Sequence, residues 1–250
     1  MSVNLISAKF LAAVYCASVL ATTGQEPDYK LCVFAYSMPI DDLHVNGGSI
    51  VDINSDGMPE VCVIAATGWQ FGVYYYMDGE VHSVDDMTSW TWSSSLLYTP
   101  DGDLFMYTYP HTVGTDGILN YRVWQWGEEG YSLAEDLWRI PTEWGWNGEG
   151  DESDYDNYGP LEFEYISSDT AMNPFEDEST YDDLLISQEE FERKTDGFDK
   201  AVMILDAHKD SHLSWGHYWW EQYYEDGEYD YDRAYAAMRQ DILEELLNWK

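Results

Sequence analysis

Residues 48–64 of this 250-residue chain read Gly-Ser-Ile-Val-Asp-Ile-Asn-Ser-Asp-Gly-Met-Pro-Glu-Val-Cys-Val-Ile, an acidic turn between two apolar segments. The flanking segments, residues 49–51 and 61–64, are rich in the β-branched residues that favour strands. The turn between them has the spacing D-x-N-x-D-G-x-x-E, and its residue types favour a tight change of chain direction. The sequence therefore predicts two strands joined by a polar loop, as part of a mainly β fold.

The loop carries the oxygen-bearing side chains that calcium prefers. Calcium binds roughly six to eight oxygen atoms in a tolerant geometry, and a turning backbone can aim acidic or amide side chains two residues apart at one point. Gly57 permits the sharp turn, because glycine tolerates a positive φ. The predicted calcium ligands are Asp52, Asn54, Asp56, Glu60 and the backbone oxygen of Met58.

The loop differs from an EF-hand in its last ligand and in its flanks. An EF-hand loop ends on a bidentate glutamate and lies between helices, whereas the corresponding position here is Val63 and both flanks are strand-like. The alternative interpretation is a turn that binds no ion, because Asp, Asn and Gly also favour ordinary turns. Glu60 and the flanking strands favour calcium.

Residues 50–64, followed by the tyrosine-rich residues 73–81, carry a resemblance to known proteins. The segment resembles the strand–loop–strand calcium segments of FG-GAP and VCBS-type repeats. It is more similar to a group of secreted proteins of gut Gram-positive bacteria with no assigned activity, whose pattern residues 97–105 and 186–191 also follow. The resemblance covers roughly residues 48–195 and implies a secreted calcium-binding protein. FG-GAP propellers repeat the loop several times, whereas this chain has it once.

The chain is strongly acidic, with 48 Asp and Glu residues against 11 Lys and Arg residues and a formal net charge of −37. Such a surface repels phosphate backbones and anionic lipid, which excludes nucleic-acid binding. An alternative reading of the acid content is a protein of a halophile that does not depend on calcium.

Residues 1–24 are expected to be a signal peptide or, alternatively, an N-terminal helix of the mature fold. Lys9 precedes the apolar run 10–21, which has the length of a signal-peptide core and is shorter than a membrane span. Ala21 is small enough for the cleavage site. We therefore expect a secreted or cell-surface protein with no transmembrane span.

The chain has three cysteines, Cys16, Cys32 and Cys62. If Cys16 is removed with a signal peptide, an even pair remains, and an oxidising compartment would allow Cys32 and Cys62 to form a disulfide. Two buried free thiols are the equal alternative.

Beyond the loop, short apolar segments alternate with turn dipeptides and predict an antiparallel meander of hairpins, in a propeller-like or sandwich-like sheet. The expected hairpins join residues 72–77 to 80–84, 90–98 to 104–109, and 118–126 to 131–140. One of these strands alternates as a half-buried strand should, with Leu119, Tyr121 and Val123 on one face and Asn120, Arg122 and Trp124 on the other. Further strands are expected at 31–36 and 161–166, and an exposed loop at 144–160.

Helices are expected toward the C-terminus. Ser187 and Glu190 form a capping box, so a short helix should start at Ser187. Apolar residues at helical spacing predict an amphipathic final helix, with the stripe Tyr235, Met238, Ile242, Leu246 and Trp249. We expect a calcium-loop β domain at 25–185 and a C-terminal helical and aromatic segment at 186–250 that packs on it.

Two further clusters are candidates for binding. His208, His212 and His217 offer transition-metal ligands, although solvated histidines are the simpler interpretation. A group of aromatic residues can stack on sugars or fill a β core, and consists of Trp215, Tyr218, Trp219, Trp220, Tyr223 and Tyr224. No nucleophile elbow, P-loop or dinucleotide fingerprint is present.

The sequence thus predicts a calcium-binding protein with a binding or structural role, whose partner is a glycan or a cell-surface protein. The alternative is a carbohydrate-binding module or a glycan hydrolase.

Overall fold

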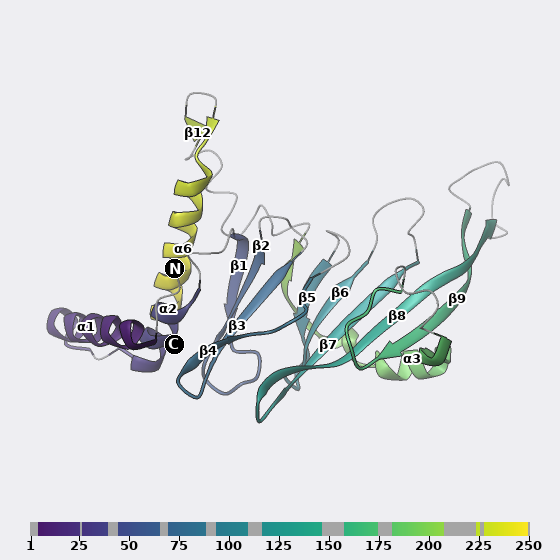
Figure 1. Ribbon diagram of the computed structural model, residues 1–250, viewed down its shortest axis with the longest axis horizontal. Coiled ribbons are helices and arrows are strands. Elements are labelled where there is room, and N and C mark those ends of the chain that lie inside the picture. The colour runs from purple at the N-terminus through teal and green to yellow at the C-terminus, as the bar shows by residue number, and fades with distance from the viewer. Residues whose placement is uncertain are drawn as a thin grey trace. The chain divides into compact units, whose positions relative to one another are not determined.

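The computed structural model describes residues 5–25, 27–39, 45–65, 70–88, 94–109, 117–146, 158–174, 182–207, 224–225 and 228–249. The chain forms two compact units (Figure 1). Unit 1 comprises Met1–Thr88 and Ile204–Lys250, and unit 2 comprises Ser89–Met203. Unit 1 is therefore discontinuous in sequence, and unit 2 is inserted between its two parts.

Unit 1 contains a four-stranded antiparallel sheet in the order β1 (Val45–Val51), β2 (Glu60–Ala65), β3 (Phe71–Met77) and β4 (Glu80–Ser83). Each strand pairs with the next one along the chain, so the β1–β2 and β3–β4 turns lie at the same end of the sheet. The helices of unit 1 are α1 (Leu5–Thr23), α2 (Tyr29–Ser37) and α6 (Tyr231–Leu247). A short hairpin, β12 (Tyr224–Glu225) and β13 (Glu228–Tyr229), precedes α6.

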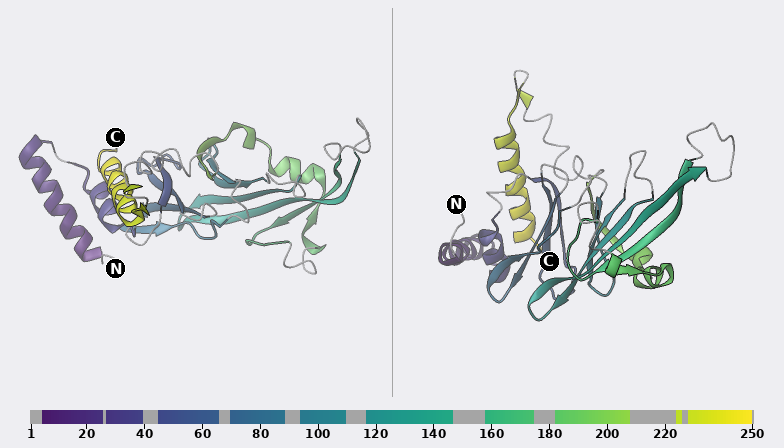
Figure 2. Two further views of the ribbon diagram at one scale, coloured as in Figure 1. Left: turned by 90° about the horizontal axis from the view of Figure 1, so that it is seen from above. Right: turned by 45° about the vertical axis from the view of Figure 1, so that its right-hand side comes forward.

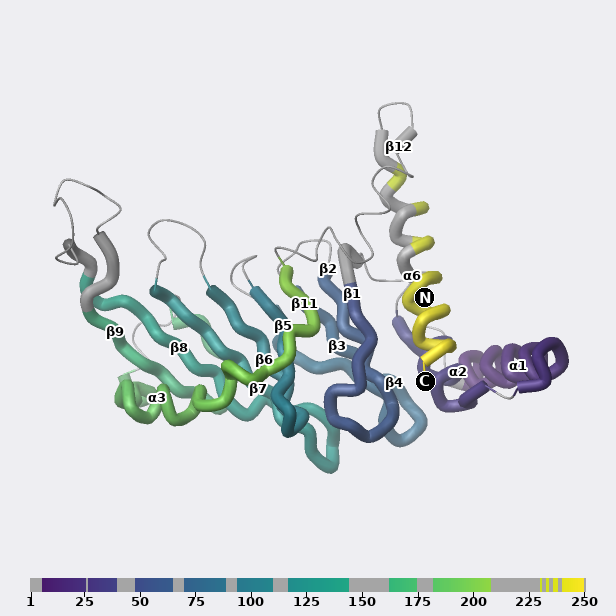
Figure 3. Tube along the Cα trace, turned by 180° about the vertical axis from the view of Figure 1, so that it is seen from behind, coloured from purple at the N-terminus to yellow at the C-terminus, as the bar shows by residue number. Residues whose placement is uncertain are grey.

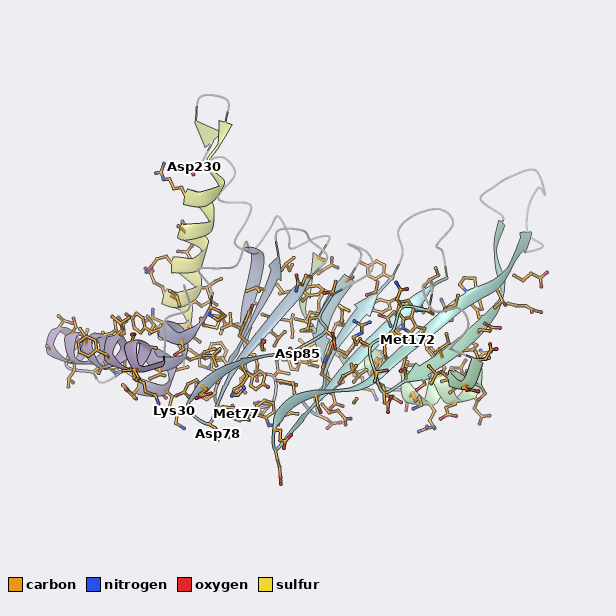
Figure 4. All side chains as sticks on the ribbon, in the orientation of Figure 1. Lys30, Met77, Asp78, Asp85, Met172 and Asp230 are labelled. Atoms are coloured by element: carbon orange, nitrogen blue, oxygen red, sulfur yellow. The ribbon has the colours of Figure 1, made fainter. Side chains whose placement is uncertain are left out.

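The core of unit 1 forms where α2 and α6 pack on one face of this sheet. The buried residues of α2 and its C-cap follow the i, i+3, i+4, i+7 spacing of one helical face, and are Leu31, Phe34, Ala35 and Met38. The sheet and α6 contribute Ile50, Val61, Val63, Tyr74, Ile242 and Leu246. The predicted final helix is therefore confirmed, and its N-cap is Asp230 (labelled in Figure 4), whose carboxylate accepts a hydrogen bond from the Arg233 N–H at 3.0 Å.

The opposite face of α2 packs against α1. Cys32 and Val33 of α2 are buried together with Ala12 of α1. The rings of Tyr15 and Tyr36 meet edge to face, with their centroids 6.1 Å apart. Helix α2 is thus buried on two sides, by the sheet and α6 on one side and by α1 on the other.

Helix α1 also exposes apolar side chains. Ile6 is 81% exposed and Phe10 is 67% exposed. Residues Ile6–Thr23 are long and apolar enough to cross a membrane by length and composition, with a mean hydropathy of 1.5. The structure confirms that this segment is helical. Its role as a signal peptide or as a helix of the mature fold, and the absence of a transmembrane span, stay predictions.

The strand predicted at residues 31–36 is wrong, because these residues lie in α2. The side chain of Asp28 caps this helix by accepting a hydrogen bond from the Lys30 N–H at 2.7 Å. A short apolar run does not distinguish a strand from a buried helix by periodicity alone. The deciding signal was the N-cap before the run, together with the continuation of the helical spacing to Met38.

Unit 2 contributes six strands to a seven-stranded sheet in the order β10-β9-β8-β7-β6-β5-β11, and the edge strand β11 runs across the boundary between Met203 and Ile204. The five consecutive strands are β5 (Ser94–Tyr98), β6 (Leu104–Thr108), β7 (Leu119–Gly127), β8 (Gly130–Trp146) and β9 (Tyr158–Ser168), each antiparallel to the next. The shorter elements are β10 (Leu185–Ile186), β11 (Val202–Asp206), α3 (Gln188–Lys194) and the 3-10 turns η3 (Asp182–Leu184) and η4 (Phe198–Lys200). The long strands β8 and β9 can be followed in Figure 3.

Helix α3 lies on one face of this sheet (Figure 2). It begins as predicted, since the Ser187 hydroxyl accepts a hydrogen bond from the Glu190 N–H at 3.2 Å. Phe191 of α3 is buried, and its ring lies 5.1 Å from that of Tyr165 and 6.3 Å from that of Tyr121. The aromatic residues of this face therefore form a packed layer beneath the helix.

The other face of β7 carries a buried polar network. Asp136 is fully buried and Arg122 is 8% exposed. The Arg122 guanidinium donates to Asp136 Oδ2 at 3.0 and 3.2 Å, and the Met172 N–H donates to the same oxygen at 2.9 Å. Asn120 Nδ2 donates to Asp136 Oδ1 at 2.6 Å. Met172, labelled in Figure 4, belongs to the segment after β9.

This network changes the expected pattern of β7. The half-buried strand predicted there has both faces covered instead, because Asn120, Arg122 and Trp124 are all buried. Hydrophobic periodicity did not identify the partner of Arg122, because Asp136 faces it from the neighbouring strand in register. A polar residue on a covered face needs such a partner.

The fold class predicted from sequence is confirmed in its main terms: mostly β, with two antiparallel sheets and helices at both ends of the chain. The three predicted hairpins and the strand at 161–166 are present over their described residues. The predicted loop at 144–160 is too long, because β8 continues to Trp146 and β9 begins at Tyr158. A propeller-like or sandwich-like arrangement and the domain boundary at residue 186 stay predictions.

We expect Asp136→Ala to lower the free energy of unfolding by about 3–5 kcal/mol, because it leaves the Arg122 guanidinium buried without its carboxylate. Urea denaturation measures the change. The matched control is Arg193→Ala, which breaks the exposed Arg193–Glu190 pair, whose side chains are 70% and 45% exposed. This control should cost no more than about 1 kcal/mol. Equal losses in the two variants would contradict the importance of the buried pair.

Candidate metal centre

The acidic loop connects β1 and β2, as the sequence predicts. The strands pair antiparallel up to Val51 opposite Glu60, so residues 52–59 close the turn. This wide turn can be followed in dark blue in Figure 3. Ser55 and Gly57 both have positive φ values, of 59° and 86°. A Cβ at Gly57 would meet no atom within 4 Å, so this position favours glycine for its backbone conformation alone.

Asp52 is the first predicted ligand, and it turns its carboxylate into the loop. Its Oδ2 accepts a hydrogen bond from the Gly57 N–H at 3.1 Å. Its Oδ1 is buried and has no hydrogen-bond partner. A buried carboxylate oxygen without a partner is costly, because it has lost its hydration without a replacement. A hydrogen bond from a donor, or contact with a cation, would therefore stabilise this oxygen.

Asn54 and Asp56 hold the turn itself. The Asp56 N–H donates to Asn54 Oδ1 at 3.0 Å, and the Met58 N–H donates to Asp56 Oδ1 at 2.7 Å. The Asn54 amide also contacts Asp56 Oδ2 at 3.4 Å. The two bonds from the backbone N–H groups are those of Asx turns, and they close the loop without an ion. Each carboxylate or amide oxygen has a further lone pair for a cation.

Glu60 is the most deeply buried of the predicted ligands, with 1% of its surface exposed. Its Oε2 accepts a hydrogen bond from the Ile53 N–H at 2.7 Å. Burial raises the pKa of the Glu60 carboxyl to about 8. The negative charges of Asp56 and Asp52 add to the rise, and the bond from Ile53 opposes it. The position thus disfavours an anion unless a positive charge is close to it.

Three carboxylates therefore lie in one loop, with different exposures. Asp56 is exposed, Asp52 is partly buried and Glu60 is buried. In the part of the chain that the structure describes, no three Asp, Glu, His or Cys side chains are gathered closely enough to hold a metal ion. Binding would consequently require the loop side chains to turn toward one another. The donor set is all oxygen, which suits calcium or magnesium rather than a soft transition metal.

The other candidates are placed differently. His208, His212, His217 and the aromatic residues 215–223 lie outside the described residues. Cys32 and Cys62 are buried and are not bonded to each other. Cys62 alternates with Val61 and Val63, the residues that pack against α2 and α6. It therefore lies on the opposite face of the sheet from α2, which carries Cys32.

We expect Glu60→Gln to stabilise the protein in the presence of a chelator. Glutamine removes the charge that burial disfavours and keeps an oxygen for the Ile53 N–H. The gain at pH 7 should be on the order of 1–3 kcal/mol, because one pKa unit corresponds to about 1.4 kcal/mol. Thermal unfolding in chelator measures it. Glu80→Gln, at an exposed position of β4, is the control and should change little. A lower melting temperature for Glu60→Gln than for the wild type would contradict the expectation.

Comparison of the chain with protein-family models, curated proteins and solved structures finds no match to any of the three.

Proposed function

We propose that the loop at residues 52–60 binds calcium, and that the ion stabilises unit 1 of a protein with a binding or structural role. The observation that carries the proposal is the buried Oδ1 atom of Asp52, which has no hydrogen-bond partner. The buried carboxyl of Glu60 lies in the same loop, where its ionised form is disfavoured. A divalent cation supplies the positive charge that both groups need.

The ion would be held by this chain's own oxygen atoms. The proposed ligands are Asp52, Asn54, Asp56, Glu60 and the backbone oxygen of Met58. Bound calcium supplies positive charge and fixes the directions of these oxygens. The chain contributes the turn, through the positive φ of Gly57, and the paired strands on either side. Because β1 and β2 also carry the core residues Ile50 and Val61, fixing the loop stabilises the core as well.

The proposed location is outside the cell. Calcium modules of extracellular proteins commonly bind with dissociation constants of about 10⁻⁴–10⁻³ M, which suits the partial exposure of this loop. The apolar helix α1 has the length and composition of a segment that directs export, and the proposed location does not require its removal from the chain. Its exposed apolar side chains support the same proposal.

The decisive measurement is the melting temperature with calcium and with chelator. Binding to the native state alone adds RT ln(1 + [Ca²⁺]/Kd), which is about 2.7 kcal/mol at a hundredfold excess over Kd, or about 10 mM calcium for a Kd of about 10⁻⁴ M. We therefore expect about 10 mM calcium to raise the melting temperature by several degrees over chelator, and fresh chelator to reverse the rise. The proposal fails if the melting temperature is the same in both.

Asp52→Asn should remove most of this calcium response. Asparagine keeps the shape of the side chain and an oxygen for the Gly57 N–H, but it lacks the charge that holds the ion. The matched control is Asp78→Asn, in the β3–β4 turn at the same end of the same sheet (Figure 4). Asp78 is exposed and has a φ of 53°, which asparagine also tolerates.

The dependence of stability on salt concentration distinguishes calcium binding from the halophile alternative. A halophile protein would gain stability from sodium or potassium chloride at molar concentration, and the Asp52→Asn and Asp78→Asn variants would behave alike. Calcium binding predicts a response at millimolar concentration that differs between the two variants. Isothermal titration with calcium chloride reports the same difference as heat, without unfolding the protein.

A further inference from the structure

Two cysteines of unit 1 meet where α1 packs against α2. The Sγ atoms of Cys16 and Cys32 lie 3.2 Å apart. Cys16 is partly exposed and Cys32 is buried, and both are free thiols. The disulfide alternative raised by the sequence joined Cys32 to Cys62, whereas the structure brings Cys32 to Cys16.

The two helices make further contacts around these sulfur atoms. Ala12 packs against Cys32 one helical turn before Cys16. The Tyr15 ring meets the Tyr36 ring one turn beyond Cys32. The Tyr29 hydroxyl donates a hydrogen bond to the Lys9 carbonyl oxygen at 3.3 Å. The sulfur atoms therefore lie within a packed helix–helix contact.

We propose that Cys16 and Cys32 form a disulfide that joins α1 covalently to α2 in the mature protein. A disulfide has a sulfur–sulfur distance of about 2.05 Å, so the two sulfur atoms need to approach by roughly 1 Å. Rotation of the two side chains supplies this movement. The bond closes a loop across 16 positions of the sequence, and it stabilises mainly by restricting the unfolded chain.

The reaction is thiol–disulfide exchange with a small disulfide such as oxidised glutathione. The Cys16 thiolate attacks one sulfur of the oxidant, forms a mixed disulfide and releases one glutathione thiolate. The Cys32 thiol then loses its proton and attacks Cys16 Sγ, and the second glutathione leaves. The two cysteines are oxidised and the oxidant is reduced to two thiols, so the electrons balance.

Burial sets the rate of the second step. It raises the pKa of the Cys32 thiol to about 12, and the neighbouring Cys16 adds to the rise. Because the thiolate is the attacking species, ring closure should be slow at neutral pH and faster at pH 9. The partly exposed Cys16 is the sulfur that the oxidant reaches first.

The disulfide has a consequence for α1. A chain cut after Ala21 would lose Cys16, whereas the cross-linked chain keeps α1 as part of unit 1. Of the two expectations for residues 1–24, the inference therefore selects the N-terminal helix of the mature fold. It does not depend on calcium binding, since neither cysteine belongs to the loop.

Peptide mapping tests the inference on the full-length protein. The folded chain is incubated with oxidised glutathione, the remaining thiols are alkylated, and the protein is digested without reductant. Trypsin cleaves after Lys9 and Lys30, and a glutamate-specific protease cleaves after Glu60 and Glu80. The three cysteines then lie on peptides 10–30, 31–60 and 61–80. We expect the first two peptides to be linked and the third to carry an alkylated thiol.

Variants separate this bond from other thiol chemistry. Cys62→Ala should leave the link intact, and Cys16→Ser, at the partly exposed position, should abolish it with little disturbance of the fold. Reductant should lower the melting temperature of oxidised wild-type protein but not that of Cys16→Ser. The inference is overturned if a link to peptide 61–80 dominates, or if glutathione stays on Cys16 without ring closure at pH 9. It is also overturned if protein from the native host begins after residue 16.

Discussion

The pairing of β1 with β2 is the interaction on which unit 1 depends. The acidic loop closes directly onto the Val51–Glu60 pair, and the adjacent residues Ile50 and Val61 are already part of the core. Charge repulsion in the loop therefore acts one residue away from the packing of α2 and α6. Like charges a few Å apart near a surface cost on the order of 1 kcal/mol or more. That energy is opposed by apolar burial on the core side of the strands.

The two units stabilise their buried carboxylates in different ways. In unit 2, Asp136 is neutralised by Arg122 and is surrounded by donors from Asn120 and Met172. In unit 1, Asp52 and Glu60 are bound by the backbone N–H groups of Gly57 and Ile53. Backbone donors satisfy hydrogen bonds but carry no full charge. The charge of the loop is therefore balanced less completely than that of the Asp136 network, which is the physical reason to look for an external cation.

The sequence predicted the structure best where neighbouring residues alone determine it. The Asp78–Gly79 turn, the Ser187 cap and the strand–loop–strand unit depend on residues close together in the chain, and all three are present. Prediction failed at α2, where a six-residue apolar run fits either a strand or a helix. It also missed the partners of Arg122, which come from β8 and the segment after β9, 14 and 50 positions away. Contacts between distant segments depend on register and packing, and no short pattern encodes them.

At the candidate site, the sequence identified the residues but not their states. Spacing placed Asp52, Asn54 and Asp56 in one turn, which the structure also has. The burial of Glu60 depends on where β2 lies in the sheet, so the composition of the loop gave no sign of it. Likewise, the proximity of Cys16 and Cys32 follows from helix packing.

The division of unit 1 into two sequence segments determines when it can fold during synthesis. Its core is completed by Ile242 and Leu246 of α6, which follows unit 2 in the sequence. Unit 2 is continuous, and its strands β5–β9 pair with their sequence neighbours. Domains generally fold as units while the chain emerges from the ribosome. Unit 2 can therefore fold before the core of unit 1 is complete. Until α6 has been synthesised, the apolar surfaces of α2 and of the four-stranded sheet that α6 covers stay exposed.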